Sequence, residues 1–331
     1  MDRTVAIIGS GVVGLTTAIT LAERGHRVTV YSDPEVSQPI ASRIAPAMFT
    51  PYPGPAVTPR FEAWTTESQR RLEKISAEYP EQSGVFPGIL REYFYAAHHH
   101  HPFLDSLLKT SPLTAPPGIE GTVSSRLHID TTLYMDWLMA QAQEYSIECI
   151  SQHIDTLSIN LPNSPDAVVN CAGLGARELT SDSRLVAMRG VVVHVPNEIG
   201  LEYSLHDDAP GGHVAYIFRF KNHLVLGGTF EPGREDFELE PGAVEGIFDR
   251  CRQLLKIDGH PRWNELSVQQ ATRTLVGLRP ARIGPDTFED IRLELDHTFP
   301  LPVIHNYGHG RQGISLSWGT AMEAANLIDS L

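Results

Sequence analysis

A glycine-rich turn close to the start of the chain restricts the fold more than any other feature. The turn, Gly-x-Gly-x-x-Gly at residues 9–14, follows an apolar run at 4–8 that is typical of a buried parallel strand. Residues 12–24 then carry apolar side chains at helical spacing, Gly25 ends that helix, and 27–31 forms a second apolar run. The pattern predicts a βαβ unit of about 30 residues in an α/β protein.

The glycines of this turn have separate physical roles in binding a dinucleotide. Gly9 permits the tight turn, Gly11 lets a pyrophosphate approach the backbone, and Gly14 lets the helix pack on the strand. The helix N-terminus offers free N–H groups to the phosphates. At the end of the second strand, Asp33, or more weakly Ser32, can accept a hydrogen bond from a ribose hydroxyl. The predicted phosphate-binding turn consists of Gly9, Ser10, Gly11, Val12, Val13 and Gly14.

The next segment bears on which dinucleotide is bound. An NAD(P)-dependent dehydrogenase would continue with alternating strands and helices, whereas residues 34–59 are dense in Gly and Pro and predict a long ordered loop. The chain returns to the sheet only at 166–173, with a strand that runs into a glycine turn. This interruption favours a flavoprotein.

The remaining pattern predicts two interleaved domains, which the length of 331 residues accommodates. Helices are predicted at 61–79, at 130–145 with Asp130 as its cap, and at 314–329. Strands are predicted at 191–195, 214–220, 224–226 and 303–306. We expect a Rossmann-like nucleotide-binding domain built from 1–50, 150–185 and 300–331. The β-rich, antiparallel substrate domain and the interdomain helices would then comprise 51–149 and 186–299.

Composition excludes several classes of protein. The net charge of −14 repels phosphate backbones, so nucleic acid is not an expected partner. The three cysteines are widely spaced and include no CxxC, which argues against a structural zinc and for a reducing compartment. No run of about 18 apolar residues occurs, and no basic segment precedes the first apolar run. We therefore expect a cytoplasmic protein without a membrane span or bound metal. The run His98–His101 is expected to be a solvated loop, because four adjacent side chains cannot all converge on one ion.

A second glycine loop, at 305–319, completes a set of motifs. The other motifs of the set are residues 7–14, residues 168–176, Leu-Gly-Gly-Thr-Phe at 226–230 and Val-Gly-Leu-Arg-Pro-Ala-Arg at 276–282. In this order and separation the chain resembles the D-amino acid oxidase family of FAD enzymes over nearly its whole length. The resemblance implies that FAD takes a hydride from Cα of a D-amino acid and that dioxygen reoxidises the flavin to give hydrogen peroxide. The imino acid then hydrolyses to a 2-oxo acid and ammonia. A homodimer is compatible with this interpretation.

The resemblance assigns the residues that hold the substrate. Arg282 matches the arginine that grips the substrate carboxylate, a role that suits the planar fork of a guanidinium. Arg279, three residues earlier, competes for that role. Tyr216, ten residues before Leu226, matches a tyrosine whose hydroxyl also contacts the carboxylate. His305 and His309 are expected to be structural hydrogen-bonding groups rather than catalysts.

The resemblance also extends the predicted FAD site beyond the first turn. One loop lies along the flavin ring, an isolated residue meets the adenine, and another contacts the cofactor at the second glycine turn. A last loop meets the pyrimidine end of the flavin and opens a helix whose positive end would stabilise negative charge on the reduced ring. These residues are Ser42, Arg43, Pro46, Ala47, Met48, Ile154, Ala172, Arg282, Gly310, Arg311, Gln312, Gly313, Ile314 and Ser315.

Three departures from the family pattern concern the substrate. Arg311 stands beside the expected position of the substrate amine, where the family commonly has Gly or Ser, and Gly212 replaces a lid tyrosine of vertebrate members. The segment 48–52 replaces a Leu-Trp-rich one. Phe230 stands where D-aspartate oxidases have an arginine, which favours neutral or apolar D-amino acids. The alternatives are acidic D-amino acids bound through Arg311, and glycine, N-methyl or cyclic imino acids.

Overall fold

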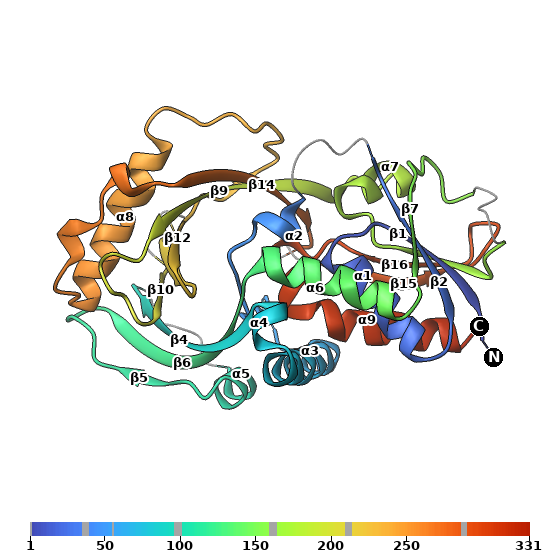
Figure 1. Ribbon diagram of the computed structural model, residues 1–331, viewed down its shortest axis with the longest axis horizontal. Helices are drawn as coiled ribbons and strands as arrows, with labels where there is room; N and C mark the ends of the chain where they lie inside the picture. Colours follow the sequence, from blue (N-terminus) through green and yellow to red (C-terminus); the bar gives the residue numbers. More distant parts are fainter. Residues whose placement is uncertain are drawn as a thin grey trace.

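The computed structural model describes residues 2–34, 40–54, 56–95, 101–158, 164–208, 214–285 and 290–331. Two sheets occupy opposite ends of an elongated molecule, and both termini lie at the same end (Figure 1). His98–His100 of the histidine run and Gly212 are outside the described residues. Within the described part, no helix combines the length and apolarity needed to cross a bilayer, and no cluster of three or more His, Cys, Asp or Glu is arranged to hold a metal.

The six-stranded sheet contains the predicted βαβ unit. Its order is β15-β16-β8-β1-β2-β7, with every neighbouring pair parallel except β15 and β16. The strands are β1 (Thr4–Ile8), β2 (Arg27–Ser32), β7 (Glu148–Ser151), β8 (Ala167–Asn170), β15 (Arg292–Asp296) and β16 (Val303–Tyr307). Strands β1, β8 and β16 are buried along their whole length, as expected for a parallel sheet covered on both faces; β1 and β8 are mainly apolar, whereas β16 also carries His305 and Asn306.

Four helices pack into one hydrophobic core with this sheet. They are α1 (Val12–Glu23), α3 (Pro59–Glu78), α6 (Thr131–Glu144) and α9 (Gly313–Asp329). The caps agree with the local sequence: the Asp130 carboxylate accepts hydrogen bonds from the N–H groups of Thr132 and Leu133, and Thr58 caps α3 ahead of Pro59. Trp318 of α9 donates a hydrogen bond to the Tyr134 hydroxyl at 2.8 Å, which joins α9 to α6 inside the core.

The ten-stranded sheet forms the other end of the molecule. Its order is β13-β9-β12-β11-β10-β4-β6-β3, with β14 paired to β9 and β5 paired to β6. The strands are β3 (Ala47–Met48), β4 (Val85–Phe94), β5 (Ser111–Leu113), β6 (Glu120–Ile129), β9 (Leu185–Pro196), β10 (Ser204–Asp207), β11 (Tyr216–Arg219), β12 (His223–Gly227), β13 (Glu231–Pro232) and β14 (Arg273–Arg282). Helix α8 (Ala243–Asp258) buries its apolar stripe against one face, in a core that includes Val191, Val193 and Ile217. The opposite face carries Tyr216 and Phe218.

The predicted fold class is confirmed: a Rossmann-like layer is interleaved with a β-rich unit. The predicted helices and the strand before the second glycine turn are present. The stretch 34–59 is less irregular than expected, because it contains the short helix α2 (Ala41–Ile44) and β3. The proposed domain boundaries stay a prediction; β3 pairs with the ten-stranded sheet and β15 with the six-stranded one. The short helices α4 (Pro80–Ser83), α5 (Pro102–Leu107) and α7 (Ala176–Thr180) complete the set described.

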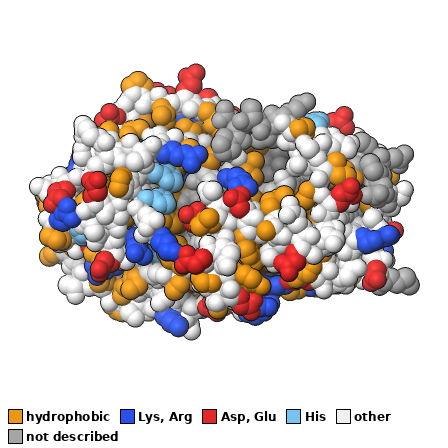
Figure 2. Space-filling model, in the orientation of Figure 1, with side chains coloured by type: hydrophobic (Ala, Val, Ile, Leu, Met, Phe, Trp, Pro, Cys, Tyr) orange, Lys and Arg blue, Asp and Glu red, His pale blue; other side chains and the backbone are white. Residues whose placement is uncertain are grey.

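Charge is distributed without a dominant sign on the face shown in Figure 2. Acidic and basic side chains are interspersed over both ends of the molecule in that view. The net charge of −14 therefore does not arise from one acidic surface there.

Gly319 tests how tightly α9 packs on α3. A Cβ at this position would lie 2.1 Å from the Trp64 carbonyl oxygen and 2.3 Å from its Cα, both backbone atoms that cannot swing aside. Alanine improves helix propensity by only about 1 kcal/mol, whereas overpacking costs about 1–3 kcal/mol. We expect Gly319→Ala to lower the free energy of unfolding measured in urea. Gly175→Ala, whose new methyl would meet Ala172 Cβ at an ordinary 3.7 Å, is the control; equal stability of both variants would contradict this packing.

Candidate active site

The two glycine loops, almost three hundred residues apart in sequence, lie side by side. A Cβ at Gly313, the first residue of α9, would be 3.8 Å from a methyl carbon of Val12, the first residue of α1. One turn further along, the Thr16 hydroxyl donates a hydrogen bond to the Ser317 carbonyl at 3.3 Å. The N-termini of α1 and α9 are therefore neighbours, and neither N-cap residue, Gly11 or Gln312, makes a capping side-chain hydrogen bond. Two positive helix ends meet at one place, which suits a ligand with negative charge.

The first turn requires glycine at two of its positions. Gly9 has φ +109°, and a Cβ there would lie 2.4 Å from the Cys171 carbonyl oxygen. A Cβ at Gly14 would be 1.8 Å from the Gly9 carbonyl oxygen. The turn thus packs directly against the second glycine turn, where Asn170 accepts a hydrogen bond from the Ala172 N–H at 3.2 Å. Both turns stand at the carboxyl ends of neighbouring parallel strands, the place where such sheets bind ligands.

The structure brings the other predicted cofactor residues to this edge in different ways. The Ser42 hydroxyl accepts a hydrogen bond from the Val12 N–H at 3.1 Å, so α2 is attached to the start of α1. Arg43 instead points to α6 and pairs with Asp136 at 2.8 Å. Pro46 lies between α2 and β3, and Ala47 and Met48 form β3.

At the end of β2, the acidic residue lies beside a histidine. Asp33 Oδ2 is 2.9 Å from His153 Nδ1, and both side chains are partly exposed. The Ser32 hydroxyl donates to the Ile150 carbonyl at 3.5 Å, whereas Ile154 is buried in an apolar cluster with Tyr31. Asp33 is thus placed where a second-strand acid meets a ribose in Rossmann-like folds, next to an apolar wall.

The second loop is tied to the segment that leaves β3. Gln312 accepts a hydrogen bond from the Tyr52 N–H at 2.7 Å. The Ser315 hydroxyl accepts from the Thr50 N–H at 3.1 Å and donates to the Met48 carbonyl at 3.3 Å. Gly310 has φ +57°, a left-handed conformation that favours glycine. Residues 310–315 and 46–52 therefore form one continuous surface next to the start of α1.

Tyr216 lies next to Arg279 on the ten-stranded sheet, on the face away from α8. Burial raises the pKa of Tyr216 above its ordinary value, and the charge and hydrogen bonding of Arg279 oppose that rise. The phenol therefore stays protonated at neutral pH and can donate a hydrogen bond. In the described part of the protein, the buried Nη1 of Arg279 has no hydrogen-bond partner, which is costly for a guanidinium unless a ligand supplies one.

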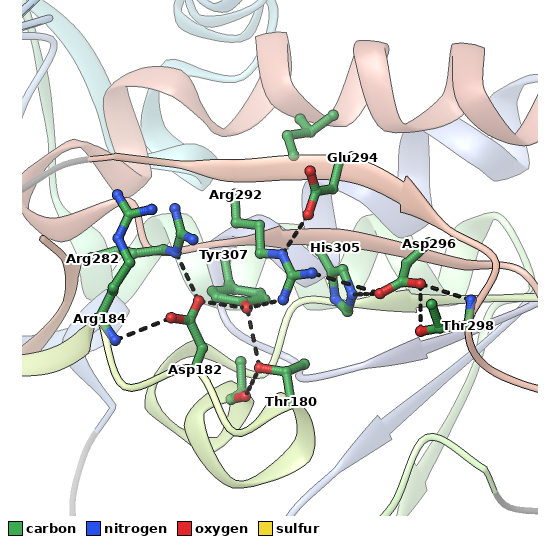
Figure 3. Close-up of polar contacts among 12 residues, drawn as sticks. Thr180, Asp182, Arg184, Arg282, Arg292, Glu294, Asp296, Thr298, His305 and Tyr307 are labelled. Carbon is green, nitrogen blue, oxygen red and sulfur yellow. Dashed lines mark hydrogen bonds and ion pairs between the residues drawn. The ribbon is translucent and has the colours of Figure 1, made fainter. Parts of the chain in front are cut away.

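Arg282, the arginine that the sequence favoured, points elsewhere. It donates from Nε to Asp182 at 2.7 Å (Figure 3). It also donates from Nη1 to Asp290 at 2.6 Å. Arg279 and Arg282 are three residues apart on β14, and side chains alternate along a strand, so they project from opposite faces. Only Arg279 shares a face with Tyr216. Of the two arginines, Arg279 is therefore the one placed to share a ligand with Tyr216, whereas Arg282 is engaged by Asp182 and Asp290.

Arg282 belongs to a polar network that links β14 to the six-stranded sheet. Asp182 also accepts a hydrogen bond from the Tyr307 hydroxyl at 2.9 Å, and Tyr307 accepts one from Arg292 at 2.9 Å (Figure 3). Asp290 pairs with Arg184 as well. Burial alone would raise the pKa of Asp182, but hydrogen bonds from Arg282 and Tyr307 outweigh it and hold the pKa below its ordinary 3.8. The network joins the strand that carries Arg279 to the strand that leads into the second glycine loop.

The two histidines of the second loop are buried hydrogen-bonding groups. His305 Nε2 lies 3.3 Å from Asp296, and His309 Nε2 lies 3.2 Å from the Thr320 hydroxyl. Burial lowers the pKa of His309 to about 3, so its ring is neutral in the folded protein. Arg311, by contrast, is exposed, and its guanidinium stacks over the Tyr52 ring at 4.1 Å.

Comparisons with known proteins define the class. Residues 4–327 match the model of the FAD dependent oxidoreductase family. The chain is 33% identical to a D-amino-acid oxidase of Streptomyces coelicolor, with 98% of this chain and 97% of the relative covered. It is 32% identical to the human D-aspartate oxidase, over 98% and 94% of the two chains. A glycine oxidase structure from Bacillus cereus superposes with a TM-score of 0.75 at 22% identity, over 99% of this chain and 95% of that one.

The chain belongs to the FAD-dependent oxidoreductase family. It is a flavoenzyme, and FAD is its cofactor. The residues present fit that group: Gly9 and Gly14 permit the close backbone packing of a tight turn between β1 and α1, and the N-termini of α1 and α9 lie together at this turn to face a pyrophosphate.

Breaking the network at Arg282 should destabilise the protein. Asp182 and Arg282 are 7% and 14% exposed, so Arg282→Met leaves a buried carboxylate without its main partner. We expect a loss of about 3 kcal/mol in the free energy of unfolding, near the lower end for a broken buried pair. Because the folded-state pKa of Asp182 is depressed, its contribution is present above pH 3.8 and is lost as the pH falls below it. Denaturation between pH 6 and pH 2 should show this decline in the wild type and a smaller one in Asp182→Asn; the same decline in both would contradict the assignment.

Proposed function

We propose that this flavoenzyme oxidatively deaminates D-amino acids, giving 2-oxo acids, ammonia and hydrogen peroxide. The observation that carries the proposal is the pair Arg279 and Tyr216, set side by side on the sheet face away from α8. The near full-length similarity to enzymes named D-amino-acid oxidase supports the same activity. The small-molecule substrate and dioxygen are then the partners of the site.

The carboxylate of the substrate would bind to Arg279 and Tyr216. A guanidinium offers two parallel N–H donors to a carboxylate, and Nη1 of Arg279 has no other partner among the described residues. The Tyr216 hydroxyl, protonated because burial raises its pKa, adds a third donor. Together these groups fix the position of Cα relative to the glycine loops, and such orientation supplies much of the rate enhancement in a reaction between two bound partners.

The chain's own residues then hold the electron acceptor and stabilise its charge. When bound, FAD accepts a hydride from Cα and delivers the electrons to dioxygen. The uncapped start of α9, at Gly313, places the positive end of a 17-residue helix where negative charge would develop. His309 is fully buried and neutral, and His305 is paired with Asp296, so neither is offered as a general base. A neutral amine needs none.

The substrate side chain is proposed to be neutral or apolar. The described surface near Tyr216 is formed by apolar and aromatic side chains, including Phe86, Phe218 and Leu275. Phe230, where D-aspartate oxidases have arginine, is 38% exposed. Arg311 is the feature that favours the alternative, an acidic D-amino acid, because its guanidinium lies over Tyr52 next to the second loop. A cytoplasmic location and a homodimer also stay part of the proposal, the first supported by three free cysteines.

A substrate panel with peroxide detection tests the activity. We expect peroxide from D-alanine and larger neutral D-amino acids, with L-alanine as the control. D-aspartate should be oxidised with a lower kcat/KM than D-alanine, since the described side chains near Tyr216 are mainly apolar. Faster turnover of glycine, sarcosine or D-proline would select a related amine oxidase, and the absence of flavin reduction by every D-amino acid would refute the proposal.

Replacing the two arginines separately tests which one binds the carboxylate. Removing one partner of a buried charge pair costs about 2–5 kcal/mol, a factor of roughly 30 to several thousand. We expect Arg279→Met to lower kcat/KM for D-alanine by a factor in this range while the protein retains FAD. Arg282→Met should reduce stability but change KM little. The opposite pattern, with KM raised only in Arg282→Met, would return the role to Arg282.

A further inference from the structure

Glycines interrupt the ten-stranded sheet on the face that carries Tyr216. Gly190 of β9 is paired with Gly277 of β14, and Gly227 ends β12 opposite Tyr216. Glycine within a strand costs stability because it packs no side chain, so such positions often mark a close approach by another group. At Gly190 and Gly227, side chains from neighbouring strands occupy the space where a Cβ would stand.

At Gly190 that space is taken by the guanidinium of Arg279. A Cβ there would lie 2.3 Å from Nη1, 2.6 Å from Nη2 and 2.8 Å from Cζ, distances that real Cβ atoms do not show. Arg279 is directly opposite Met188, two residues before Gly190, so its side chain runs diagonally across the neighbouring strand. The flat fork therefore rests on the bare backbone of Gly190.

Tyr216 is seated in the same way. A Cβ at Gly227 would lie 2.0 Å from Cζ and 2.3 Å from the hydroxyl oxygen of Tyr216, and one at Gly228 would be 2.9 Å from that oxygen. On β9, Val192 pairs with Gly227, and Gly190 lies two residues away on the same face. Gly190 and Gly227 therefore lie near each other on one face of the sheet. The guanidinium of Arg279 and the phenol of Tyr216 pack on their backbone.

We propose that Gly190 is a positioning residue for carboxylate recognition, acting through Arg279. The inference rests on the proposed function. Bidentate recognition requires the guanidinium plane in one orientation, and losing one of its charge-assisted hydrogen bonds weakens carboxylate binding by roughly 10- to 100-fold. Because the group that a Cβ would strike is the far end of a flexible side chain, alanine at this position lifts the arginine rather than breaking the sheet.

The test compares Gly190→Ala with the wild-type holoenzyme. We measure flavin content, and KM and kcat for D-alanine. We also measure the Kd of propionate, which has the carboxylate but lacks the amine, from the change that its binding causes in the flavin absorption spectrum. We expect KM and the propionate Kd to rise together by roughly 10- to 100-fold, with kcat changed about threefold at most and flavin content retained. Unchanged KM and propionate Kd would overturn the proposal.

A control and a double variant separate positioning from general damage. Val191, the next residue on β9, is buried on the opposite face among the residues that α8 covers. Val191→Ala should lower the urea midpoint of unfolding, as expected for a truncated core side chain, without raising KM. In an Arg279→Met background, Gly190→Ala should raise KM no further, whereas an additional rise would overturn the proposed route through Arg279.

A double variant tests the proposal if Gly190→Ala alone does not fold. If Gly190→Ala fails to hold FAD, Gly190→Ala with Arg279→Ala should restore flavin content, because the colliding group is gone; failure to restore it overturns the proposal. The proposed function fails separately. If the wild type oxidises no D-amino acid, the propionate Kd of Gly190→Ala still reports whether Gly190 positions Arg279 to bind a carboxylate.

Discussion

The close approach of two backbone turns is the constraint on which the rest of the structure depends. Gly9 lies so near the Cys171 carbonyl that only a residue without a side chain, at φ +109°, can occupy it. This contact aligns the carboxyl ends of β1 and β8 and places the start of α1 beside the start of α9. The two helix ends, the hydrogen bonds that Ser315 accepts from Thr50 and donates to Met48, and the proposed cofactor surface lie around that contact.

The second sheet carries the proposed substrate-binding groups, Arg279 and Tyr216, on one face by strand register. Glycines occur where a guanidinium and a phenol must lie flat, and side-chain alternation along β14 decides which arginine faces them. Among the residues that the structure describes, Nη1 of Arg279 has no hydrogen-bond partner, whereas Arg282 is paired with both Asp182 and Asp290. The site thus keeps an unsatisfied positive charge that a carboxylate can neutralise, and the fold is stabilised elsewhere by a satisfied one.

The sequence predicted those features for which the residue pattern is compatible with a single local structure. The Gly9 turn, the Asp130 cap and the fold class all emerged from residue spacing or from resemblance to a known family. Strand β14 was not predicted, because it contains Pro280 and three arginines and lacks the usual alternation. Without that strand, no argument could place Arg279 and Arg282 on opposite faces. The long strands β4 and β6 were missed for a similar reason, since buried polar residues such as Arg126 and His128 break their apolar pattern.

A crystal structure of the holoenzyme with bound propionate would show which arginine holds the carboxylate. We expect the carboxylate on the guanidinium of Arg279 and the hydroxyl of Tyr216, above Gly190 and Gly227. We also expect Arg282 to keep its contacts with Asp182 and Asp290. A carboxylate held by Arg282, with those ion pairs broken and Arg279 unoccupied, would contradict this assignment.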